Sequence, residues 1–206
     1  MAAIFIDYVT LMLINMVAGL FLLGAFVLKG IDSEGRADWA PGFGAVGLVA
    51  LLFGLHMSWT WPLPGSYNIA FGELSVLFGA VHLGIALGLA RDWRLHGIGV
   101  YAAFGGFTSL IVGTRILQLW LTAPKEDWLT ASPALAGIAF VLSGLAGVLF
   151  FPVTIWSRKP NLCRAAAIVL FLAGLLWGMT ATFAYWGHLT GFAKYTPEVM
   201  QQVQGN

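Results

Sequence analysis

The chain has 206 residues, of which 59% are hydrophobic and 9% charged, and its formal net charge is +1 at pH 7. Soluble domains carry about 25% charged residues, so this composition excludes an ordinary water-facing surface. The small net charge provides no field that would attract nucleic acid, and we expect no nucleic-acid partner. The single cysteine, Cys163, excludes an intrachain disulfide and a CxxC metal site.

Six apolar stretches have the length of a membrane-spanning helix, which needs about 20 mostly apolar residues. They are continuous rather than alternating, which favours helices over strands. The expected spans are residues 4–28, 42–61, 67–90, 97–121, 133–156 and 165–187. We therefore predict an all-α, polytopic membrane protein, with one six-helix transmembrane domain over residues 1–190 and a short polar tail over 191–206.

Lysine and arginine are unevenly distributed between the two ends of the predicted bundle. Seven of them belong to the first, third and fifth connections: Lys29, Arg36, Arg91, Arg94, Arg158, Lys159 and Arg164. The opposite side, counted with the tail, holds Lys125 and Lys194. By the positive-inside rule the richer side is cytoplasmic. We therefore expect both termini and the second connection on the outer side of the cell (plasma) membrane.

Three ionisable side chains lie within the expected spans at similar depth. Helical rise places His56, Glu73 and Arg115 about 8–9 Å below the predicted outer surface. Ionisable groups in a membrane usually face the bundle interior, so we expect these three to share one pocket, with Glu73 paired to Arg115. Other polar and aromatic side chains near the same surface complete the predicted pocket: Asp7, Trp59, Tyr67, Tyr185 and His188.

The predicted pocket suits more than one ligand. Asp7, His56, Glu73 and His188 offer oxygen and imidazole ligands to a metal ion, whereas histidine, arginine and aromatic walls suit a quinone head group. No two histidines match in depth, so a haem would need a single histidine or a second ligand from a partner subunit. A purely structural salt bridge between Glu73 and Arg115 is an equally good interpretation.

His82 lies about 22 Å below the predicted outer surface, in the middle of the third span. It shares a helix face with Ser75 and Gly79. A histidine at this depth either relays protons or forms a hydrogen bond to a carbonyl of a neighbouring helix, and the second role is the more frequent one. Small residues also recur at helical spacing, which lets helix backbones approach closely: Gly105, Ser109 and Gly113 in the fourth span, and Ala139, Ser143 and Gly147 in the fifth.

The second connection and the start of the third span, residues 59–73, read WTWPLPGSYNIAFGE. This segment resembles the signature segment of a domain-of-unknown-function family of small polytopic membrane proteins in bacteria and archaea. The resemblance covers most of the chain and implies a polytopic fold. Because that family has no assigned activity, the resemblance implies no functional residues.

Three functions fit these observations. The first is a subunit of a membrane redox complex that binds a quinone, haem or metal ion beneath the outer face. The second is a structural subunit without a ligand, and the third is a permease for a proton, an ion or a small solute. A self-contained enzyme is not expected, since no nucleophile–base arrangement or phosphate-binding loop occurs. The expected partners are the lipid bilayer and other membrane subunits or further copies of the chain.

Overall fold

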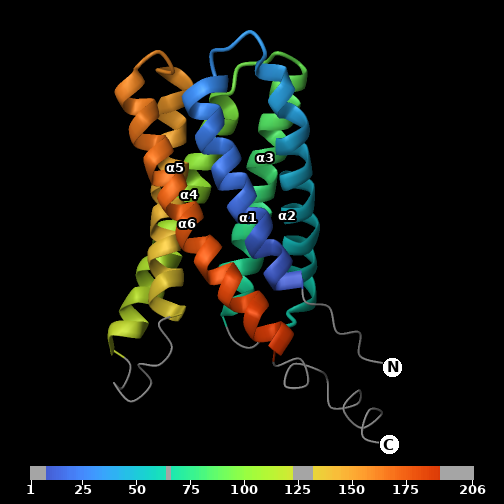
Figure 1. Ribbon diagram of the computed structural model, residues 1–206, viewed down its shortest axis with the longest axis vertical. Helices are drawn as coiled ribbons and strands as arrows, with labels where there is room; N and C mark the ends of the chain where they lie inside the picture. The colour runs from blue at the N-terminus through green and yellow to red at the C-terminus, as the bar shows by residue number, and fades with distance from the viewer. Residues whose placement is uncertain (1–7, 64–65, 123–131, 191–206) are drawn as a thin grey trace, which may run out of the picture.

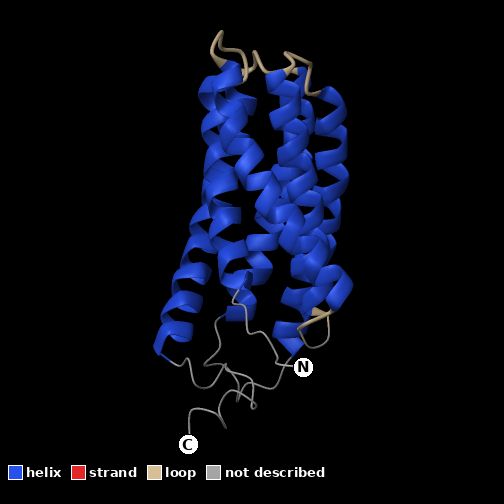
Figure 2. Ribbon diagram, turned by 90° about the vertical axis from the view of Figure 1, so that its right-hand side faces the viewer, coloured by secondary structure: helices blue, strands red, loops and turns tan. Residues whose placement is uncertain are grey.

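The computed structural model describes residues 8–63, 66–122 and 132–190, which are helical apart from short connections (Figures 1 and 2). Six helices in these segments are long and apolar enough to cross a membrane. The prediction of an all-α membrane protein with six spans is therefore confirmed.

The helices follow one another with short breaks, and two of the spans contain a π-helical turn. The elements are α1 (Tyr8–Ala25), η1 (Phe26–Gly30, π), η2 (Arg36–Trp39, 3-10), α2 (Ala40–Thr60), η3 (Asn68–Glu73, π), α3 (Leu74–Ala90), α4 (His96–Thr122), α5 (Ser132–Ile155) and α6 (Pro160–Thr190). The sixth span starts earlier than expected, because α6 begins at Pro160 rather than at residue 165. Proline suits the first helical position because its missing N–H has no helical partner there. The expected start of the first span, at residue 4, lies outside the described residues.

The bundle consists of three antiparallel helix pairs: α2 with α3, α4 with α5, and α1 with α6. The α4–α5 pair meets the other helices mainly through α6 and, less extensively, through α3. Helix α6 slants across the bundle, so that its far end lies beside α1 rather than beside α5 (Figure 1).

Glycines bring the backbones of α2 and α3 into contact. A Cβ atom added at Gly47 would lie 2.6 Å from the backbone nitrogen of Leu83 and 2.9 Å from the carbonyl oxygen of Gly79. At Gly54 it would lie 2.7 Å from the nitrogen of Val76. These distances are shorter than any real Cβ contact, so a residue larger than glycine does not fit while the backbones keep these positions.

The α4–α5 pair repeats this contact in the same register. A Cβ at Gly106 would lie 2.5 Å from the carbonyl oxygen of Gly144, and a Cβ at Gly113 would lie 2.8 Å from that of Gly137. In each of the four helices the two contact glycines are seven residues apart: 47 and 54, 72 and 79, 106 and 113, 137 and 144. A seven-residue period keeps one face of a helix against its partner. We call these contacts the glycine seams.

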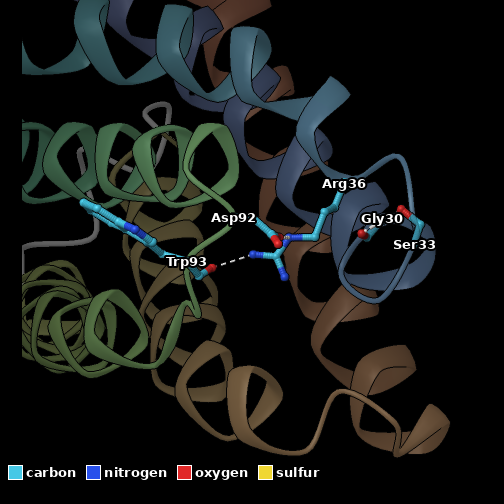
Figure 3. A network of polar contacts seen from close by, with 5 residues as sticks. All are labelled: Gly30, Ser33, Arg36, Asp92 and Trp93. Carbon is cyan, nitrogen blue, oxygen red and sulfur yellow. Dashed lines mark hydrogen bonds and ion pairs between the residues drawn. The ribbon is translucent and has the colours of Figure 1, made fainter.

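Three polar connections meet at the end of the bundle drawn at the top of Figure 1, and we call it the basic end: residues 31–35, 91–95 and 156–159. The guanidinium of Arg36 donates from Nη2 to the backbone carbonyl of Trp93, and its Nε lies 3.6 Å from Asp92 Oδ1 (Figure 3). The hydroxyl of Ser157 donates to Asp32 Oδ1 at 2.8 Å. The first connection is thereby joined to both others.

Asp92 allows the chain to turn sharply after α3. Its φ is 52°, and the Trp93 N–H donates to the carbonyl of Gly88 at 2.7 Å while the Asp92 N–H donates to that of Leu89 at 3.3 Å. These are the two hydrogen bonds of a Schellman motif, with aspartate where glycine is usual. The motif fixes the Trp93 carbonyl in the position where Arg36 binds it.

The glycine seams predict opposite effects for two alanine substitutions. We expect Gly144→Ala to destabilise the protein, because its Cβ would meet the Gly106 carbonyl oxygen at 2.7 Å. The expected loss is about 1–3 kcal/mol, the usual cost of forcing extra atoms into a packed interior. Gly187→Ala, in α6, has nothing within 4 Å of its Cβ and is expected to be neutral or slightly stabilising. Thermal unfolding in detergent measures both, and equal effects would contradict the seam.

The Arg36 contacts predict a second pair of effects. Arg36→Met removes the hydrogen bond to the Trp93 carbonyl, and we expect a loss of about 1 kcal/mol and faster amide hydrogen exchange in residues 31–39 and 91–95. Asp92→Asn tolerates the same backbone conformation and is expected to change little, because the Asp92 side chain is 89% exposed and exposed ion pairs contribute little. A larger loss for Asp92→Asn than for Arg36→Met would show that the ion pair is the dominant contact.

Candidate functional site

The three side chains predicted to share an outer pocket do not contact one another. His56, on α2, is exposed, and its ring meets the edge of the Tyr8 ring with centroids 5.3 Å apart. Glu73, at the end of η3, is exposed. Arg115, on α4, is also exposed, and its Nη1 donates to Gln118 Oε1 of the same helix at 2.9 Å. Among the described residues, no hydrogen bond or ion pair joins any two of the three.

The glycine seams explain these orientations. Successive residues of an α-helix are rotated by about 100°, so a side chain two positions after a seam glycine points away from the partner helix. His56 follows Gly54 by two positions, and Arg115 follows Gly113 by two positions. The two side chains therefore occupy equivalent places in the two helix pairs, and each faces outward from its own pair.

The other predicted pocket residues are spread over the same end of the bundle. Trp59 and Tyr67 are 77% and 57% exposed, and the Tyr67 ring stacks on Phe71 with centroids 6.4 Å apart. Tyr185 and His188 are half-buried on α6. Asp7 lies outside the described residues. Within residues 8–63, 66–122 and 132–190, no three His, Cys, Asp or Glu side chains are grouped so that they could hold a metal ion.

Asn68 organises the connection that carries the family resemblance. Its side chain is 0% exposed, its Oδ1 accepts from the Leu63 N–H at 3.0 Å, and its Nδ2 donates to the Leu63 carbonyl. Trp61 ends α2 with a φ of 48°, a conformation that costs a non-glycine residue about 1–2 kcal/mol. The paired hydrogen bonds of Asn68 hold the chain in this turn.

His82 is buried, with 1% of its surface exposed, between α1 and α3. Its Nδ1 lies 2.9 Å from the Phe78 carbonyl oxygen, and its Nε2 lies 3.4 Å from that of Gly19. The Phe78 ring packs on the imidazole with centroids 4.0 Å apart. A neutral imidazole has one N–H, so the shorter contact is the hydrogen bond. The sequence predicted a hydrogen bond to a carbonyl of a neighbouring helix, whereas the shorter contact lies within α3, and the Gly19 carbonyl of the neighbouring helix α1 faces the other ring nitrogen.

A cavity of about 100 Å³ lies between the α4–α5 pair and helices α1, α3 and α6. Along η3 and α3 its lining extends from Ala70 to His82, a length of about 18 Å at 1.5 Å per residue. Most of the lining is apolar, and the polar lining residues are Ser75, His82, Ser109 and Ser143. The space is therefore long, narrow and mostly hydrocarbon-like.

The seams also determine which residues line this cavity. Ser75 and His82 each follow a seam glycine of span 3 by three positions, and Phe140 and Gly147 do the same in α5. The two helix pairs thus present equivalent faces to the cavity from opposite sides. Most of the polar and small lining residues are recognisable in the sequence by their helical spacing, which indicates helix packing but does not predict a cavity.

The polar cavity residues differ in their hydrogen bonding. The Ser109 hydroxyl donates to the Phe140 carbonyl at 2.8 Å, and the Ser143 oxygen accepts from Trp177 Nε1 at 3.0 Å. The Ser75 hydroxyl makes no hydrogen bond to any residue in the described segments. Serine in a helix often donates to the carbonyl four residues earlier, so this free donor at the cavity wall is the group best placed to recognise a polar atom of a ligand.

Comparisons with known proteins identify a family and add no activity. No protein of curated function and no solved structure matches the chain. One protein family, described as "Protein of unknown function (DUF981)", matches residues 1–191. That match covers all six spans, including the segment from Trp59 to Glu73 that suggested such a family. The chain is therefore an integral membrane protein that belongs to the DUF981 family.

Proposed function

We propose that this protein binds an isoprenoid quinone in the cavity between the α4–α5 pair and helices α1, α3 and α6, as a subunit of a redox system in the plasma membrane. The observation that carries the proposal is the cavity itself, which lies within the spans and has a long, mostly apolar lining. Ligand sites of this kind combine apolar walls with a few polar groups that fix orientation. The outer pocket expected from the sequence is replaced in this proposal by the internal cavity.

The dimensions of the cavity favour a slender ligand. An apolar cavity of about 150 Å³ binds benzene, so a cavity of about 100 Å³ excludes a haem and takes a quinone ring only when side chains of its lining shift slightly. His82 Nδ1 is hydrogen-bonded to the Phe78 carbonyl, and the Gly19 carbonyl oxygen lies 3.4 Å from Nε2, which leaves no room for an iron atom at either ring nitrogen in this arrangement. A quinone ring needs only a hydrogen-bond donor for its carbonyl oxygen, and the Ser75 hydroxyl supplies one.

Orientation and partners complete the proposal. The basic end lies at the cytoplasm, as the positive-inside rule indicates. Further membrane subunits or copies of the chain pass electrons to and from the quinone, because the chain contributes no redox group of its own in this scheme. The ligand-free structural subunit is the alternative that the following experiments distinguish.

Filling the cavity tests the proposal directly. A Cβ at Gly105 would meet only Leu77, at 3.6 Å, so the Gly105→Leu side chain enters the cavity without striking backbone. We expect quinone retained by the purified protein to fall at least tenfold, as measured by solvent extraction and mass spectrometry. Gly187→Leu places the same side chain in open space and is expected to retain the wild-type amount. No quinone in the wild-type protein, or equal retention in both variants, would favour the structural subunit.

Ser75→Ala tests the polar contact. Loss of one neutral hydrogen bond costs about 1 kcal/mol, so we expect a short-chain quinone to bind about fivefold more weakly in a titration followed by tryptophan fluorescence. Ser58→Ala is the matched control, because the Ser58 hydroxyl donates to Gly54 within α2, away from the cavity. Equal affinity of the wild-type and Ser75→Ala proteins would exclude Ser75 as the donor.

A further inference from the structure

A second pocket lies at the basic end, where α1 and η1 end and α6 begins. Its volume is about 470 Å³, and it is lined by residues 27–29, 31–33, 157, 158, 160, 163 and 164. Three of the lining side chains are cationic: Lys29, Arg158 and Arg164. The pocket is separate from the internal cavity, with which it shares no lining residue.

The three cations have no counter-ion among the residues that the structure describes. The ion pair of the described residues joins Arg36 to Asp92 and involves none of them. The acidic lining residue, Asp32, already accepts a hydrogen bond from Ser157. Three positive charges facing one carboxylate leave an excess of two in this pocket.

The start of α6 increases this positive potential. A long helix carries about half a positive charge at its N-terminus, and α6 is a helix of 31 residues that begins at Pro160 in the pocket. Cations beside a helix N-terminus are unfavourable, yet Arg158 and Arg164 flank this one. An anion bound between them would interact favourably with both cations and with the positive end of the helix dipole.

The pocket also lies at the level of the lipid head groups. Trp156 is 50% exposed, and Lys159 Nζ lies 5.2 Å from its ring centroid, an arrangement typical of the membrane interface. Leu28, which lines the pocket, is 43% exposed, and Ile168, one turn beyond Arg164, is 58% exposed. A bound head group would therefore have apolar surface beside it along which acyl chains extend towards the bilayer centre.

We propose that this pocket binds the phosphate of an anionic phospholipid, held by Lys29, Arg158, Arg164 and the N-terminus of α6. Arginine and lysine pair well with phosphate oxygens, and basic pockets between spans on the cytoplasmic side are a recurring form of lipid site. A free phosphate ion presents the same oxygens but has no chains for Leu28 and Ile168 to contact. The adjacent apolar surface therefore favours the lipid.

The test compares two double variants of the full-length protein. Arg158→Gln with Arg164→Gln removes two pocket cations, whereas Arg91→Gln with Arg94→Gln removes two exposed cations at the same end of the bundle but outside the pocket. Native mass spectrometry measures retained phosphatidylglycerol against phosphatidylcholine. We expect the wild type and the 91/94 variant to prefer phosphatidylglycerol, and the 158/164 variant to lose at least tenfold of that preference. The single variant Lys29→Gln should lose a smaller part of the preference for phosphatidylglycerol. It keeps the test valid if the double variant does not fold.

Three outcomes would overturn the proposal. Equal retention of the two lipids by the wild type would show that the pocket is not a lipid site. Equal losses in the two double variants would show attraction by overall charge alone. Displacement of phosphatidylglycerol by inorganic phosphate at matched concentration would show a site for a free anion, because the acyl chains would then contribute nothing. Size-exclusion profiles and thermal unfolding of every variant confirm that each is folded.

Discussion

The arrangement of this protein depends on backbone-to-backbone contact at the two glycine seams. Lipid chains are as apolar as the helix surfaces, so association within a membrane relies on close packing rather than on the hydrophobic effect. The contacts of Gly47 and Gly54 with span 3, and of Gly106 and Gly113 with α5, provide that packing. They fix the rotation of four helices, and rotation decides which side chains face the cavity, the partner helix or the lipid.

The six spans were predictable because the thickness of the hydrocarbon layer strictly limits the length and composition of a membrane-spanning helix. The shared outer pocket was not, since helical rise gives the depth of a residue but leaves its direction around the helix open. His56 and Arg115 have similar depth, yet both follow a seam glycine by two positions and point away from their partner helices. The spacing of the seam glycines is visible in the sequence, but glycine is frequent in all six spans, and only the contacts identify which glycines matter.

The cavity is the consequence of a difference between helix pairs. The α2–α3 and α4–α5 pairs are joined by equivalent glycine contacts, whereas the α1–α6 pair packs through larger side chains, with the rings of Phe21 and Phe171 5.5 Å apart. The slanted α6 therefore cannot close against both α5 and α3 along its whole length (Figure 1). The space that remains lies beside His82 and Ser75, so these two polar residues of span 3 face a region where packing is incomplete.

The connections at the two ends of the bundle are stabilised in different ways. At the far end, Asn68 uses its own amide to hold the turn after α2, and the connection is completed within the chain. At the basic end, Arg36 and Ser157 join the three connections, but Lys29, Arg158 and Arg164 have no counter-ion among the described residues. Charge that a protein leaves unbalanced at the head-group level is balanced by the membrane, where anionic lipids concentrate at the cytoplasmic surface. In the proposed lipid site, an anionic phospholipid supplies the negative charge that the described residues lack at the basic end.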